Sequence, residues 1–187
     1  QTTPGIYSVV AKNTTTHCTT NMTGTATVAI YTLPVVYNIT GGGNYCSGGS
    51  GVLIGLSGSN SGISYQLMNG GAFSGTPVSG TGLPINFGLQ TFSGGYTVVA
   101  TSSSTSCVDT MHGTATVGIN TLPTAYNVTG GGAYCTGAAG VHVGLDGSAV
   151  GTNYQLVLAG VTPIGTLVPG TGTTLDFGWQ TTAGTYT

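Results

Sequence analysis

Charged side chains are nearly absent from this chain. Of its 187 residues, Lys12 is the only basic one, and Asp109, Asp146 and Asp176 are the only acids. Charged residues make up 2% of the sequence, against about 25% in an ordinary soluble domain. Nucleic acids and anionic lipid surfaces are bound by clustered Lys and Arg, so the composition excludes both as partners.

Long hydrophobic runs are also missing. No apolar segment approaches the roughly 18 residues that are needed to span a bilayer, so membrane insertion is not expected. The sequence begins at Gln1, with neither an initiator Met nor a signal peptide. We therefore expect a processed form or a window of a longer protein.

A low charge content and 35 glycines could indicate disorder, but disordered chains are poor in aromatic and β-branched residues. This chain has 10 Tyr and many Val, Ile and Thr residues, which favour strands. No segment has a helical period. The composition predicts an ordered, all-β protein.

The sequence repeats itself at a fixed step. YNITGGGNYCSG, which begins at Tyr37, returns as YNVTGGGAYCTG at Tyr126, and Cys18 returns at Cys107, 89 residues later in both cases. After Leu156 the later copy carries one extra residue, in a Gly-rich segment of the kind in which surface loops tolerate insertions. An internal repeat of this length predicts tandem domains.

Alternating apolar residues predict the strands of one repeat and their inward faces. They place Leu53 and its counterpart His142 outside, and Trp179 inside with Leu175 and Phe177. Gly- and Ser-rich turns separate about seven short strands, which is typical of an immunoglobulin-like antiparallel β-sandwich. The residues expected in the core of the complete repeat are Val52, Ile54, Leu56, Tyr65, Leu67, Phe87, Tyr96, Val98, Val117 and Ile119.

The phase of the repeat predicts one complete and two partial sandwiches. Leu-Pro pairs before Val35 and Thr124 suggest joints, so residues 1–34 are the last two strands of one repeat and 35–123 a complete repeat. Residues 124–187 are the front of a third repeat without its closing strands. We expect copies of the chain to join head-to-tail, with residues 1–34 closing residues 124–187 of the next copy, unless the native chain is simply continuous.

The pattern Y-C-x-G-x-x-G-V, followed by Y-Q-L, F-G-x-Q-T and G-x-Y-(T/S)-V-V-A, covers the whole chain. It resembles the tandem Ig-like (PKD-like) repeats of very large bacterial cell-surface and secreted proteins of the adhesin type. The resemblance implies an extracellular or cell-surface location. It implies little about a ligand, because a fold alone does not determine function.

Catalytic, cofactor and metal sites are not expected. A repeat that carried chemistry would supply the same groups in both copies, but Asp146 corresponds to Ser57 and Asp176 to Asn86. The isolated acids offer no carboxylate pair for acid–base catalysis and no oxygen cluster for calcium. We expect that the protein is not an enzyme.

The cysteines recur at two positions per repeat, which in an exported chain favours disulfides over metal. Cys46 and Cys107 belong to the complete repeat, so we expect them to pair, and Cys18 to pair with Cys135 of an adjoining chain. The alternative is a partner from a neighbouring domain, if Cys46 and Cys107 lie at opposite ends of the sandwich.

Covalent glycans would solvate an uncharged surface. Asn38 and Asn127 occupy equivalent N-x-T sequons and are the favoured sites. Asn13 and Asn21 are further sequons, and Thr110 lies in an Asp-Thr-Met segment that resembles an O-glycosylation signal.

These observations lead to two hypotheses of different class. The first is a structural subunit of an extracellular bacterial filament or surface array. The second is an adhesive or carbohydrate-binding surface module. An exposed row of aromatic side chains on one face would support it.

Overall fold

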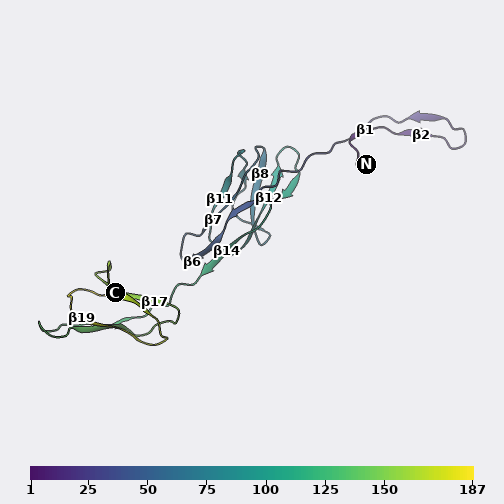
Figure 1. Cartoon of the computed structure of the whole chain (residues 1–187). Coiled ribbons are helices and arrows are strands. Elements are labelled where there is room, and N and C mark those ends of the chain that lie inside the picture. The colour runs from purple at the N-terminus through teal and green to yellow at the C-terminus, as the bar shows by residue number, and fades with distance from the viewer. The chain divides into compact units, whose positions relative to one another are not determined.

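The computed structural model describes all 187 residues, and they form strands but no helix. Nothing in the chain could therefore cross a membrane as an apolar helix. Contacts divide the chain into two compact units, Gln1–Asn120 and Thr121–Thr187. Within the first unit, the strands of residues 1–34 pair only with one another, so these residues are described separately below (Figure 1).

Residues 35–120 carry two sheets, and both are antiparallel apart from one parallel pair between β6 (Gly43–Cys46) and β14 (Ala115–Asn120). The smaller sheet has the order β11 (Ile85–Gln90), β7 (Val52–Leu56), β5 (Ile39–Gly41). The larger sheet has the order β10 (Val78–Ser79), β8 (Ile63–Asn69), β12 (Gly94–Ser102), β14 (Ala115–Asn120), β6 (Gly43–Cys46). Two short strands extend it, β13 (Val108–Thr110) beside β12 and β9 (Ala72–Phe73) beside β8. This arrangement is consistent with a β-sandwich.

The predicted inward faces of β7, β8 and β12 are confirmed. Ile54, Tyr65 and Val98 are fully buried, whereas Leu53 is 51% exposed, so the register of β7 is the expected one. Eleven buried residues form one core, and Tyr37, Val52 and Phe87 pack against it. The core residues are Ile54, Leu56, Tyr65, Leu67, Ile85, Tyr96, Val98, Ala100, Met111, Ala115 and Val117.

Ile119, expected in the core, is 43% exposed, and that prediction is wrong. The cause is the end of the neighbouring strand. β12 begins at Gly94, which pairs with Val117, so β14 continues beyond it with only β6 at its side. Ile119 lies opposite Tyr45 in this overhang. It has no neighbour in β12, whereas Val117 is paired with Gly94 of that strand.

A β-bulge overturns a second expectation, that Trp179 faces inward with Leu175 and Phe177. In β19 (Leu175–Gln180), Phe177 and Gly178 together lie opposite the single residue Val143 of β16. Gly178 has a φ of 79°, which a residue without Cβ adopts at no steric cost. The extra residue reverses the alternation, so Trp179 is 59% exposed, as is its counterpart Leu89 at 56%.

The first 34 residues form a long hairpin. β1 (Gly5–Tyr7) pairs with β4 (Ala26–Val28), and β2 (Val10–Lys12) pairs with β3 (Thr19–Asn21). None of residues 1–33 is fully buried. A two-stranded hairpin of this kind is marginally stable by itself in water.

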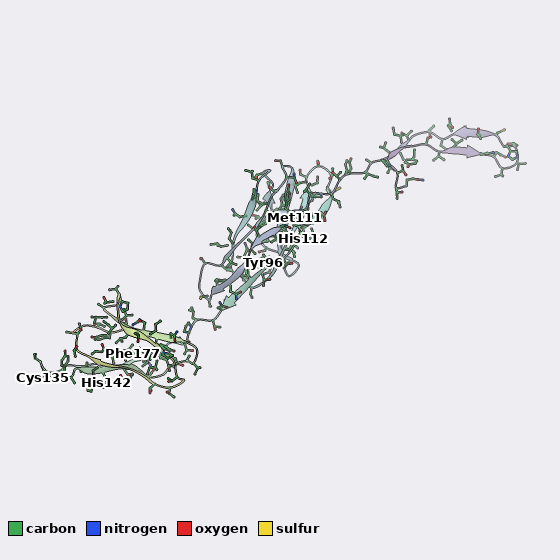
Figure 2. The ribbon with its side chains drawn as sticks, viewed as in Figure 1. Tyr96, Met111, His112, Cys135, His142 and Phe177 are labelled. Carbon is green, nitrogen blue, oxygen red and sulfur yellow. The ribbon has the colours of Figure 1, made fainter.

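The C-terminal unit has two small sheets, which Figure 1 shows as separate layers. One has the order β15 (Val128–Gly130), β16 (Val141–Leu145), β19 and corresponds to β5, β7 and β11 of the complete repeat. The other pairs β17 (Asn153–Leu158) with β18 (Thr162–Pro169). Val143, Leu145, Leu156 and Leu175 are buried between the layers, and Phe177 lies there half-buried (Figure 2).

Candidate functional site

The strands β12 to β14 supply most of the core in the complete repeat. Six of its eleven buried residues come from this segment, Tyr96, Val98, Ala100, Met111, Ala115 and Val117. Figure 2 places Tyr96 and Met111 within the body of the repeat. β12 also pairs with β8, and their backbones lie side by side over seven residue pairs, from Tyr96 with Asn69 to Ser102 with Ile63. Without this segment, one sheet would lose its centre.

The C-terminal unit has no strands equivalent to most of β12 or to β13 and β14, and its inner face is open where they would lie. A cavity of about 250 Å³ is found there. Tyr126, Val128, Tyr154 and Phe177 line it, and their counterparts in the complete repeat are core residues or pack against the core. Tyr154 is half-buried although its counterpart Tyr65 is fully buried. The apolar inner face of a sandwich is therefore present, but no strands equivalent to β13 and β14 pack against it.

The last residues of the chain pair with β17. Tyr186 bridges to Leu158 in an antiparallel pair, and Thr187 exchanges two backbone hydrogen bonds with Val157, of 2.8 and 2.9 Å. Tyr186 corresponds to Tyr96 of the complete repeat, and Leu158 corresponds to Asn69, the residue with which Tyr96 pairs. Apart from these contacts, the strand partner of β17 is β18.

The segment Gly132–Cys135 shows the effect of the missing cover on local structure. Its counterpart β6 is a strand because it pairs with β14, but Gly132–Cys135 has no such partner and is irregular. Tyr134 still donates its phenol hydrogen bond to the carbonyl of Thr181, as Tyr45 does to Thr91. The side chain is thus in place while the strand is not formed.

The N-terminal hairpin has the register of the missing strands. Gly5 pairs with Val28 and Val10 with Asn21, each 89 residues before the pairs of Gly94 with Val117 and Val99 with Thr110. The bond from Met22 N to Val9 O is 2.8 Å, and that from Met111 N to Val98 O is also 2.8 Å. The hairpin therefore has the geometry of β12 to β14 without a domain around it.

The apolar side chains of this hairpin are exposed where their counterparts are buried. Val9 is 64% exposed and Met22 43%, while Val98 is 0% and Met111 3% exposed. Burying side chains of this size contributes roughly 1.5–3 kcal/mol each. The hairpin thus leaves exposed the apolar side chains whose counterparts form the core of the complete repeat.

All four cysteines are free thiols, and the predicted disulfide between Cys46 and Cys107 is wrong. Cys46 ends β6 opposite Asn120, beyond one end of β12, whereas the carbonyl of Cys107 accepts from Ser102 N at the other end. A nine-residue strand such as β12 is roughly 27 Å long, and a disulfide requires Cα atoms within about 7 Å. The two thiols lie at opposite ends of the repeat.

Cys18 and Cys135 hold the equivalent positions. The carbonyl of Cys18 accepts from Asn13 N at 2.8 Å, as that of Cys107 does from Ser102 N at 2.9 Å, and both follow a residue with positive φ. Cys135 lies at an extremity of the C-terminal unit (Figure 2). A hairpin that closed this unit as β12 to β14 close the complete repeat would hold the Cys18 and Cys135 thiols apart in the same way.

The five glycosylation candidates are all exposed. They are Asn13, Asn21, Asn38, Thr110 and Asn127. The amide of Asn127 donates from Nδ2 to Asp146 Oδ2 at 2.7 Å, and its backbone N–H donates to Asp146 Oδ1 at 2.8 Å. These two bonds, the first above all, lower the pKa of Asp146. At Asn38, Ser57 Oγ takes the place of the carboxylate and accepts from the backbone N–H at 3.1 Å.

Comparison of the chain with protein-family models, with curated proteins and with solved structures gives no match.

Proposed function

We propose that this chain is a structural subunit of an extracellular bacterial filament or surface array, built head-to-tail from Ig-like repeats. The observation that carries the proposal is the match between residues 9–28 of the exposed hairpin and the open inner face of the C-terminal unit. Each has the surface that the other lacks, in the register that the complete repeat uses. Strand addition of this kind obtains its affinity from backbone hydrogen bonds and its specificity from buried side chains.

An immunoglobulin-like topology is part of the proposal. Two facing sheets, with β12 between β8 and β14 in the larger one, agree with it. A tyrosine at the start of the strand equivalent to β12 donates to a carbonyl four residues upstream in all three copies, as in the tyrosine corner of such domains. The bonds join Tyr7 to Thr3, Tyr96 to Phe92 and Tyr186 to Thr182.

The segment that closes each open unit starts at Val9. Residues Gln1–Ser8 correspond to Gln180–Thr187, which the open unit already possesses, so a following hairpin continues from Thr187 with Val9. It comes either from a second copy or from the next repeat of one continuous polypeptide. A contact that joins unlike surfaces and does not close into a ring gives a filament.

An extracellular location and covalent glycans on Asn38 and Asn127 belong to the same proposal. Their support is the scarcity of charge and the exposure of both sequons. The free thiols of the structure add no support for an oxidising compartment.

A reducing, denaturing gel of the native material, alongside electron microscopy, tests the proposal. A polymer joined by strand addition shows filaments and falls to bands near 18.4 kDa, whereas a continuous array shows filaments and runs many-fold larger. Native material that is monomeric and without fibrous form would overturn the proposal.

A further inference from the structure

The outer face of β16 and β19 carries a cluster that the other repeat lacks. Trp179, turned outward by the bulge at Gly178, pairs across the strands with His142. The two rings have their centroids 4.0 Å apart at an interplanar angle of 57°. Trp179 is the only tryptophan of the chain, and 59% of its surface is exposed. This face therefore presents one large aromatic ring to solvent, in contact with an imidazole.

The polar groups beside this ring are fixed in position. His142 Nδ1 donates to Asp176 Oδ2 at 2.7 Å, and the backbone N–H of Gly178 donates to Asp176 Oδ1 at 2.8 Å. These bonds fix the orientation of the carboxylate. They also lower the pKa of Asp176, and the bond from His142 has the largest effect. A carboxylate has about four lone-pair positions, so Asp176 keeps acceptor capacity toward a ligand, and His142 Nε2 is a further polar atom.

A groove of about 400 Å³ adjoins the cluster, with His142 and Asp176 in its wall. Thr129 and Thr174 add hydroxyl groups, and Gly130 and Gly144 add backbone without side chains. This volume lies within the roughly 300–1,000 Å³ of small-molecule sites. The groove wall therefore offers hydrogen-bond donors and acceptors, and the ring of Trp179 lies against one of its residues, His142.

We propose that this face, centred on Trp179, His142 and Asp176, binds a neutral saccharide. A sugar ring has an apolar face that stacks on an aromatic plate and hydroxyls that both donate and accept, which is what this surface offers. An anion would meet the Asp176 carboxylate, and a metal ion would find no third His, Cys, Asp or Glu close enough to join His142 and Asp176.

The complete repeat supplies an internal comparison. Its outer face has a similar groove of about 290 Å³, but Leu53, Asn86 and Leu89 replace His142, Asp176 and Trp179. Leu53 and Leu89 pair across the strands as His142 and Trp179 do. The groove is thus a feature of the repeat, while the aromatic plate and the ion pair are particular to the C-terminal unit. Only that unit is expected to bind.

The test is titration of the full chain with cellotriose, maltotriose and chitotriose, each up to about 10 mM. Fluorescence of the single tryptophan reports on the ring itself, and calorimetry measures the variants. We expect saturable binding of at least one trisaccharide with a change in Trp179 emission. Trp179→Leu, which copies Leu89, should weaken binding at least 10-fold, and Asp176→Asn, which copies Asn86, several-fold. Phe73→Leu, at a side chain 81% exposed in the complete repeat, is the matched control and should bind like the wild type.

Three results would overturn the proposal: no saturable binding of any trisaccharide, equal affinity in Trp179→Leu, or equal loss in Phe73→Leu. Tetramethylammonium is titrated in parallel, since a cation can also bind over a tryptophan face beside a carboxylate. Saturation by this cation without binding of a sugar would overturn the saccharide assignment. Because the substituted side chains are exposed, unchanged circular dichroism is expected for all variants. The filament proposal does not depend on the outcome.

Discussion

The phenol of Tyr96 donates a hydrogen bond to the backbone carbonyl of Phe92 over 2.8 Å, although the Tyr96 side chain is fully buried. The bond ties the start of β12 to the loop that precedes it. Burial raises the pKa of Tyr96, so the neutral phenol persists throughout the ordinary pH range. The equivalent bonds of Tyr7 and Tyr186 show that it forms even where the rest of the repeat is absent.

Tyr96→Phe should therefore destabilise the complete repeat by about 1 kcal/mol, because it leaves a partly buried carbonyl without its donor. Urea unfolding followed by circular dichroism measures the change. Tyr31→Phe is the control, since Tyr31 is 60% exposed and its phenol makes no hydrogen bond. An equal effect of the two substitutions would show that the Tyr96 bond contributes nothing specific.

The register of β7 gives a second prediction. Ile54→Ala should reduce the free energy of unfolding by about 2–5 kcal/mol, because the side chain is 0% exposed and its removal leaves a cavity. Leu53→Ala, one residue away on the exposed face, should change it by less than about 0.5 kcal/mol. The same urea experiment decides, and a reversed order would mean that the strand has slipped by one residue.

The placement of the cysteines gives a third prediction. Alkylation of the folded monomer without reductant should add four labels, because Cys46 and Cys107 lie at opposite ends of the repeat and cannot meet. Mass spectrometry of the intact chain counts the labels. A Cys46–Cys107 linked peptide in a non-reduced digest would contradict this geometry.

Asp146 gives a prediction about pH. Its pKa is lowered from 3.8 by the hydrogen bonds from Asn127, so the folded state binds the proton less readily than the unfolded chain. The stabilisation is present above about pH 4 and is lost as the pH falls through the lowered pKa. The thermal midpoint of the C-terminal unit should therefore fall between pH 6 and pH 2. Asp176, whose pKa is also lowered, contributes in the same direction.

The substitution Asp146→Ser separates the contribution of Asp146 to this pH dependence from that of Asp176. Serine is the residue of the other repeat, where Ser57 Oγ accepts from Asn38 N, so the backbone bond can be retained without a titrating group. The variant should lose a part of the pH dependence while keeping most of its stability at pH 6. A fall in midpoint as steep as that of the wild type would rule out a role for the Asn127–Asp146 bonds.

Much of the fold follows from the sequence, because alternation and repetition report directly on burial. The 89-residue step and the inward faces of Ile54, Tyr65 and Val98 could be predicted without a structure. Trp179 could not be placed by alternation, since a bulge reverses the pattern in the middle of the strand. The signal was Gly178, because a lone glycine in a strand pattern often marks a bulge.

The predictions for the cysteines and for Ile119 are wrong for a different reason. Their surroundings depend on where neighbouring strands end, and periodicity carries no information about that. Cys46 and Cys107 share a repeat but lie beyond opposite ends of β12, and Ile119 extends past Gly94 into an overhang. The cluster of His142, Asp176 and Trp179 was hidden in the same way, because only the bulge brings Trp179 to the outward side that His142 occupies.

The most direct test of the central claim is sedimentation velocity of the purified chain over a range of concentrations. If the hairpin of one copy closes the open unit of another, as we propose, the wild type should form species larger than 18.4 kDa as the concentration rises. Val9→Asp should remain monomeric, since its counterpart Val98 is fully buried. Thr27→Asp, which adds the same charge at a position whose counterpart Thr116 is exposed, should assemble like the wild type. A chain that stays monomeric at every concentration, or a Val9→Asp variant that assembles unchanged, would contradict head-to-tail closure by residues 9–28.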